Sequence, residues 1–130
     1  MAHYLDTSAL VKLVLAEPES ASLREWLLQG EREPVTSDLA RTELLRAVRR
    51  TAPERAVAAH EVLETMIVLT LATETFESAG RLEPATLRAL DALHLAAALE
   101  LGDDLEGLVV YDERLAEAAN AYGIRTLSPT

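Results

Sequence analysis

The chain has 130 residues, of which 49% are hydrophobic, which is enough for one substantial core in a single domain spanning residues 1–130. It has no cysteine, which excludes disulfides, thiolate zinc sites and cysteine nucleophiles, and its three histidines are scattered without ligand spacing. The net charge of −10 is opposite to the basic surface typical of nucleic-acid-binding proteins.

Short apolar runs alternate with longer segments of helical period in the first half of the chain. In order, we predict a strand at His3–Leu5, a helix at Thr7–Leu15, a helix at Ser20–Leu28, a strand at Pro34–Thr36, and a helix that Ser37 or Asp38 caps and that runs to about Arg50. Pro18 and Pro53 follow two of these helices, as expected of a residue that cannot continue a helix.

The same alternation continues in the second half. In order, we predict a helix at Glu54–Thr65, a strand at Met66–Leu71, helices at Glu74–Arg81 and Pro84–Leu101, a strand at Leu108–Tyr111, a helix at Glu113–Ala121 and a last strand at Ile124–Leu127. Strands that alternate with helices are typical of an α/β fold, in which helices cover both faces of a parallel sheet.

Two acidic residues stand directly after predicted strands. Asp6 follows His3–Leu5, and Asp112 follows Leu108–Tyr111. Ligands of open parallel sheets bind beyond the carboxyl ends of the strands, so parallel pairing would bring both acids to one edge. Aspartate is also a favoured N-cap, and capping of the next helix would by itself account for either residue.

Two further acids lie inside predicted helices, where an acid needs a compensating partner. Glu43 stands about one turn into its helix among apolar neighbours, and Asp91 is flanked by leucines in the least polar helix of the chain. Aspartate has modest helix propensity and is rarely buried unless it is paired. Simple ion pairs would also account for both residues, with Arg46 or Arg50 as the partner of Glu43 and Arg88 or His94 as the partner of Asp91.

A cation would be needed if the four acids met. Two carboxylates ~5 Å apart repel each other by about 3 kcal/mol at an effective dielectric constant near 20. Four of them would either bind a divalent ion or hold protons. Oxygen donors without histidine or cysteine favour Mg²⁺ or Mn²⁺ over zinc.

Four stretches carry a resemblance to a known family: YLDTSALVKL, ARTELLRAV, LRALDALHLAAAL and VVYDERLAEAANAYGI. They resemble PIN-domain ribonucleases, and more narrowly the VapC-type toxins of bacterial toxin–antitoxin modules. The resemblance implies a three-layer α/β/α fold with a mostly parallel five-stranded sheet. It also implies a Mg²⁺- or Mn²⁺-dependent endoribonuclease that hydrolyses RNA, forms a homodimer and is neutralised by a VapB-type antitoxin. The metal-binding acids of the family correspond to Asp6, Glu43, Asp91 and Asp112.

One position departs from the family pattern. Val110 stands two residues before Asp112, where the family usually has a small hydroxyl residue, and Thr7 or Ser8 would have to supply that hydroxyl. We expect His94, on its alanine- and leucine-rich helix, to be a packed core residue. The arginines of the Glu43 helix either steer RNA phosphates, face solvent or contact another subunit; they are Arg46, Arg49 and Arg50.

Two other functions remain open. A phosphatase with Asp6 as nucleophile would need a second aspartate two residues later, where Ser8 stands. A non-catalytic module could use the acidic surface to bind a basic partner. The sequence opens without a signal peptide, and its longest apolar run, Leu95–Leu99, is far shorter than the roughly 20 residues of a membrane span, so we expect a cytoplasmic protein.

Overall fold

A computed structural model describes residues 1–130, and its central element is a five-stranded sheet in the order β3-β2-β1-β4-β5. All neighbouring strands are parallel. The strands are β1 (Ala2–Leu5), β2 (Glu33–Ser37), β3 (Ile67–Leu69), β4 (Leu105–Val109) and β5 (Thr126–Leu127). The prediction of a mostly parallel five-stranded sheet is therefore confirmed.

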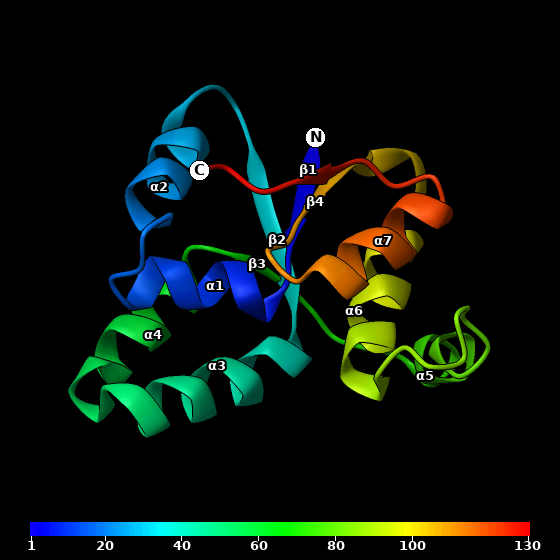
Figure 1. Cartoon of the computed structure of the whole chain (residues 1–130), viewed down its shortest axis with the longest axis horizontal. Coiled ribbons are helices and arrows are strands. Elements are labelled where there is room, and N and C mark those ends of the chain that lie inside the picture. Colours follow the sequence, from blue (N-terminus) through cyan, green and yellow to red (C-terminus); the bar gives the residue numbers. More distant parts are fainter.

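Helices cover both faces of this sheet (Figure 1). On one face lie α1 (Thr7–Val14), α2 (Ser20–Leu28), α3 (Asp38–Thr51) and α4 (Ala56–Glu64), with the short 3₁₀ helix η1 (Pro53–Arg55) between the last two. On the other lie α6 (Ala89–Glu100) and α7 (Glu113–Ala121), with α5 (Thr73–Ala79) packed against α6 and the 3₁₀ helix η2 (Gly102–Asp104) leading into β4. This arrangement is the predicted three-layer α/β/α fold.

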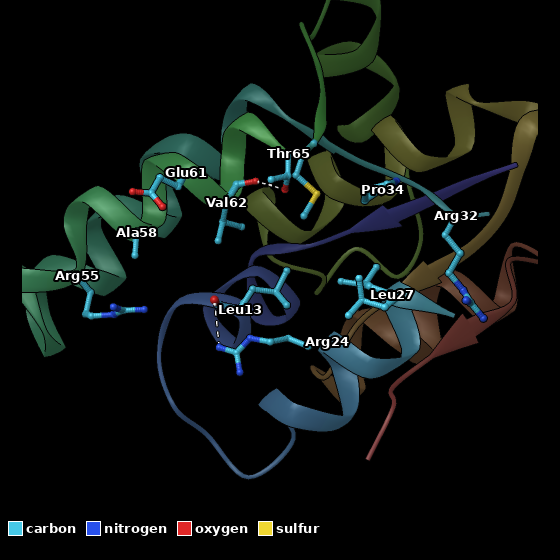
Figure 2. Close-up of a pocket in the computed structure, with 12 residues that line it drawn as sticks. Leu13, Arg24, Leu27, Arg32, Pro34, Arg55, Ala58, Glu61, Val62 and Thr65 are labelled. Atoms are coloured by element: carbon cyan, nitrogen blue, oxygen red, sulfur yellow. Dashed lines mark hydrogen bonds between the residues drawn. The ribbon is translucent and has the colours of Figure 1, made fainter. Parts of the chain in front are cut away.

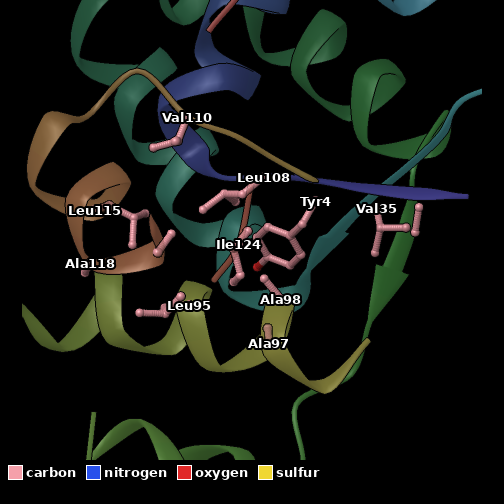
Figure 3. Close-up of a cluster of buried hydrophobic side chains, with 12 residues drawn as sticks. Tyr4, Val35, Leu95, Ala97, Ala98, Leu108, Val110, Leu115, Ala118 and Ile124 are labelled. Carbon is pink, nitrogen blue, oxygen red and sulfur yellow. The ribbon is translucent and has the colours of Figure 1, made fainter. Parts of the chain in front are cut away.

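The two helical layers have separate cores because alternate residues of a strand point to opposite faces. On β1, Tyr4 joins the core that faces α6 and α7, whereas Leu5 joins the core that faces α1, α3 and α4. On β4, Leu108 and Val109 divide in the same way. Figure 3 shows the first of these cores, with Tyr4 and Leu108 packed over the alanine-rich α6. Side chains of β1 and β4 thus pack into a core on each face of the sheet. This packing fixes the positions at which the two strands end.

Two predicted boundaries differ from the structure near that edge. The helix predicted at Pro84–Leu101 begins only at Ala89, because Leu87 packs into the core and Arg88 is extended (φ −65°, ψ 148°). The strand predicted at Leu108–Tyr111 is β4, which already begins at Leu105 and ends at Val109. No helix has the length and apolar composition needed to cross a membrane.

Candidate active site

The carboxyl ends of β1 and β4 lie side by side, and this brings two of the acids to one edge. The two strands pair in register from His3 to Leu5, with Leu5 opposite Val109. Beyond this pair, the Asp6 backbone N–H donates to the Val109 carbonyl over 3.3 Å. The chain reaches Asp112 three residues after Val109. The parallel pairing inferred from the sequence is therefore confirmed.

Asp6 is a buried carboxyl group with one oxygen held by the protein. Its side chain is the N-cap of α1, and Oδ1 accepts from the Ala9 N–H over 3.2 Å and from the Ser8 hydroxyl over 2.6 Å. No donor reaches Oδ2. The residue is only 3% exposed, and burial raises its pKa from 3.8 to about 6. The charge of Asp91 acts in the same direction, which shows that these two carboxyl groups are close enough to interact.

Glu43 reaches the same edge from α3 and is fixed by two hydrogen-bond partners. Its Oε1 lies 2.7 Å from the Thr7 hydroxyl and 2.6 Å from His94 Nε2. On the far side of the imidazole, Nδ1 lies 2.8 Å from the hydroxyl of Tyr4. Burial would raise the pKa of Glu43, but the hydrogen bonds of His94 and Thr7 outweigh it and lower the pKa below its usual value. Glu43 therefore stays ionised at a pH at which Asp6 still holds its proton.

The other two acids share one guanidinium group. Arg88 Nε lies 3.2 Å from Asp91 Oδ2, and Arg88 Nη2 lies 3.4 Å from Asp112 Oδ2. The second oxygen of Asp112 caps α7 by accepting from the Leu115 N–H over 3.0 Å. The Arg88 side chain is 66% exposed, and its positive charge also helps to lower the pKa of Glu43. The exposed guanidinium of Arg88 thus interacts with three of the four acids.

A common pattern emerges from the carboxylate oxygens. In Asp6, Glu43 and Asp91, one oxygen accepts from the protein and the other has no protein donor. A carboxylate that is oriented through one oxygen and free at the other is suited to bind a cation. The donor set therefore fits a hard divalent ion such as Mg²⁺ or Mn²⁺.

The side chains do not already enclose such an ion. No three acidic or histidine side chains stand in a cation-binding group as they lie. Arg88 occupies one oxygen each of Asp91 and Asp112, so ion binding by these residues would require the guanidinium to move. Asp91 and Asp112 are joined through Arg88, whereas Asp6 and Glu43 each bind their own protein partners.

The structure also settles the simpler interpretations. Asp6 and Asp112 are both N-caps, as considered above, and Arg88 is a partner of Asp91. The ion pair of Glu43 with Arg46 or Arg50 is wrong, since Glu43 binds Thr7 and His94 instead.

Several residues of the site were missed or only half understood from the sequence. His94 is 1% exposed, as expected of a core residue, but it also links Tyr4 to Glu43. Val110 is buried and offers no hydroxyl, while the Thr7 and Ser8 hydroxyls bind Glu43 and Asp6. The spacing of Arg88 and His94, three residues either side of Asp91, was the only sequence signal for their place at the site.

Comparison with known proteins agrees with this fold. A family model described as "PIN domain" matches residues 3–121, a span that includes all four acids. "Ribonuclease VapC47" of Mycobacterium tuberculosis (strain CDC 1551 / Oshkosh) is 43% identical, over 97% of this chain and 96% of the relative. "Ribonuclease VapC46" of M. tuberculosis (strain ATCC 25618 / H37Rv) is 42% identical, over 98% of this chain and 97% of the relative. The chain belongs to the PIN-domain family and, within it, to the VapC ribonucleases.

Solved structures share the fold at much lower identity. The crystal structure of M. tuberculosis VapC20, described as a sarcin–ricin loop cleaving toxin, superposes with a TM-score of 0.79 at 18% identity, covering 98% of this chain and 99% of that one. VapBC2 from Rickettsia felis, solved with a promoter DNA fragment, gives a TM-score of 0.75 at 16% identity and full coverage of both chains. The three-layer architecture is therefore that of VapC structures.

Proposed function

We propose that this chain is a Mg²⁺- or Mn²⁺-dependent endoribonuclease that acts as the toxin of a type II toxin–antitoxin pair. The observation that carries the proposal is the set of three carboxylates at one sheet edge, each with one oxygen free of protein donors. Relatives more than 40% identical over nearly the whole chain are named ribonucleases, which supports RNA as the substrate.

The residues of the site would have two roles, which are to bind the cation and to orient the carboxylates that bind it. Asp6, Glu43 and Asp91 would hold the cation through their free oxygens, and Asp112 would join once Arg88 has left it. A divalent ion in such a site lowers the pKa of water and stabilises charge on phosphoryl oxygens. Thr7, Ser8 and His94 would keep the carboxylates oriented, because their hydrogen bonds occupy the oxygens that face the protein.

Single amide substitutions test this proposal. Asp6→Asn and Asp91→Asn should each lose about 100-fold or more of the metal-dependent RNA cleavage. Asparagine is itself a favoured N-cap, so α1 should remain intact in Asp6→Asn. Asp103→Asn, in η2 before the amino end of β4, removes the same charge from the opposite edge and should cleave like wild type. Full cleavage by both active-site variants would refute the assignment.

A groove on the helical layer that contains α1, α2 and α4 is the candidate site for a VapB-type antitoxin. It measures about 670 Å³ and lies between α1, α2 and α4, as Figure 2 shows. Six of the twelve residues that line it are hydrophobic, and one of them, Leu28, is 86% exposed. Arginines stand around it in an otherwise acidic chain; they are Arg24, Arg32 and Arg55. An amphipathic helix with an apolar face and acidic flanks would fit this surface.

The test uses a VapB-type antitoxin, sought in the reading frame next to that of this chain. Val62→Glu places a charge on the groove wall and should abolish inhibition by the antitoxin, while RNA cleavage by the free protein stays normal. Val57→Glu, an equal change at an exposed apolar residue of α4 that does not line the groove, should leave inhibition unchanged. Full inhibition of Val62→Glu would place the antitoxin elsewhere.

The same proposal includes a homodimer. Phe76 on α5 and Leu90 on α6 are 53% and 46% exposed, and a small apolar hollow lies beside them. A second copy of the chain would cover this surface. Light scattering should report a dimer for wild type and a monomer for Phe76→Glu; a wild-type monomer, or a dimer that survives the substitution, would contradict this interface.

A further inference from the structure

A second cleft opens beside the acids. It measures about 560 Å³ and lies between α7 and the loop that precedes α6. The cleft shares Arg88 and Asp91 with the acid site, and its other polar lining residues include Thr86, Arg114 and Glu117. A chain bound at the carboxylates would therefore extend directly into this cleft.

The two arginines of the cleft differ in their present partners. Arg88 is bound to Asp91 and Asp112, whereas Arg114 is exposed on the first turn of α7 and forms no ion pair or side-chain hydrogen bond. The charges of these arginines are balanced in the cleft by Asp91 and Glu117. Once a divalent ion neutralises Asp91, the cleft has an excess of positive charge.

We propose that this cleft holds the RNA backbone next to the cleaved bond, with Arg114 and Arg88 each binding a phosphate. Arg88 does so by leaving the carboxylates when a divalent ion takes its place. The inference rests on the proposed ribonuclease function and adds the side chains that position its substrate.

The geometry makes the exchange of Arg88 easy. Its two ion-pair distances are 3.2 and 3.4 Å, and its side chain is 66% exposed, so water screens both contacts. A guanidinium matches a phosphate as well as it matches a carboxylate, since both accept two parallel hydrogen bonds. Phosphate binding by Arg88 and Arg114 would also supply attraction for RNA that the net charge of −10 does not.

The first test measures RNA binding as a function of salt. The probe is a labelled single-stranded RNA of about 12 nucleotides, with Ca²⁺ in place of Mg²⁺ so that binding is measured without efficient hydrolysis. Arg114→Ala should lower the slope of log K against log salt by about 0.7, the value for one phosphate contact, and Arg114→Lys should restore it. Arg125→Ala, which removes the same charge just before β5 at the amino edge of the sheet, should leave the slope unchanged. An unchanged slope in Arg114→Ala overturns the proposal.

The second test measures metal binding without RNA. Arg88→Ala should bind Mn²⁺ about three- to tenfold more tightly in titration calorimetry, because the ion no longer competes with the guanidinium. Arg114→Ala touches no carboxylate and should bind Mn²⁺ like wild type. Equal or weaker Mn²⁺ binding by Arg88→Ala overturns the exchange.

The outcomes separate this inference from the function on which it rests. A wild-type protein that cleaves RNA, together with unchanged binding slopes in the arginine variants, overturns the cleft and leaves the ribonuclease standing. A wild-type protein without metal-dependent cleavage removes both.

Discussion

The two halves of the acid site are built in different ways. Asp6 and Glu43 are held by hydrogen bonds from neighbouring hydroxyl groups and from the buried His94. Asp91 and Asp112 lie on the outer side, where a single exposed arginine joins them. The inner half has fixed geometry because its donors belong to the packed core. The outer half depends on a screened contact and can change partners at little cost.

The inner half therefore sets where a bound cation would lie, and the outer half adapts to the cation that is present. The inner carboxylates define where a cation would sit, since their orienting hydrogen bonds are shielded from water. The outer carboxylates can adapt to whatever cation is present, whether an arginine side chain or a metal ion. Substitutions in the two halves should therefore differ most in their effect on folding stability.

The largest expected effect comes from His94. His94→Ala should lower the free energy of unfolding by about 3 kcal/mol, because a buried ring is lost and both Tyr4 and Glu43 lose a hydrogen-bond partner. Urea denaturation of the metal-free protein measures this change. A loss below that of an ordinary surface substitution would show that the inner half is not as rigid as its contacts indicate.

The next effect concerns pH and Asp6. The pKa of Asp6 is about 6 in the folded chain and 3.8 when unperturbed, so the folded state binds the proton more tightly between these values. Metal-free stability should fall as the pH rises from about 4 to about 6, by at most roughly 3 kcal/mol, and level off above. Asp6→Asn should lack this fall and be more stable than wild type at pH 7 in EDTA. Parallel stability curves for the two proteins would contradict the raised pKa.

Metal binding should reverse the loss of folding stability that the ionised Asp6 causes. At a concentration 100 times its dissociation constant, Mn²⁺ should stabilise the wild type by about 2.7 kcal/mol. The gain should shrink below the pKa of Asp6, because the ion has to displace a proton there. Thermal unfolding with and without Mn²⁺ measures it, and an equal gain in Asp6→Asn would place the ion elsewhere.

The smallest effect on folding is expected in the outer half. Arg88→Ala should change the free energy of unfolding by less than about 0.5 kcal/mol, since both ion pairs are screened by water. Urea denaturation beside His94→Ala compares the two halves directly. Equal losses in the two variants would remove the distinction between them.

The sequence predicted the part of the site that follows from strand order. Asp6 directly follows β1 and Asp112 lies three residues after the end of β4, and the parallel pairing of these strands brings both acids to one edge. The helix acids could be noticed because an acid among apolar neighbours needs a partner, but the partner itself could not be identified. Thr7 and His94 reach Glu43 from 36 and 51 residues away, a distance that no local pattern encodes.

The start of α6 shows a second reason why the sequence could not predict the whole structure. Proline favours a helix start, and the apolar pattern from Pro84 onward is compatible with a helix. Pro84 to Leu87 instead form a turn, in which the Leu87 N–H donates to the Pro84 carbonyl over 2.9 Å, and Leu87 packs against the core. Arg88 is extended, so α6 begins only at Ala89. Tertiary packing thus overrides the local preference, and the turn leads into Arg88, the residue that binds the acids.

The position of β1 in the centre of the sheet has a consequence for synthesis of the protein. Asp6 is translated well before β4, the strand that completes its surroundings and that ends at Val109. A growing chain therefore cannot assemble the site until β4 has been translated. Nascent chains that stop before β4 should consequently have the first acids of the site but not the surroundings that position them.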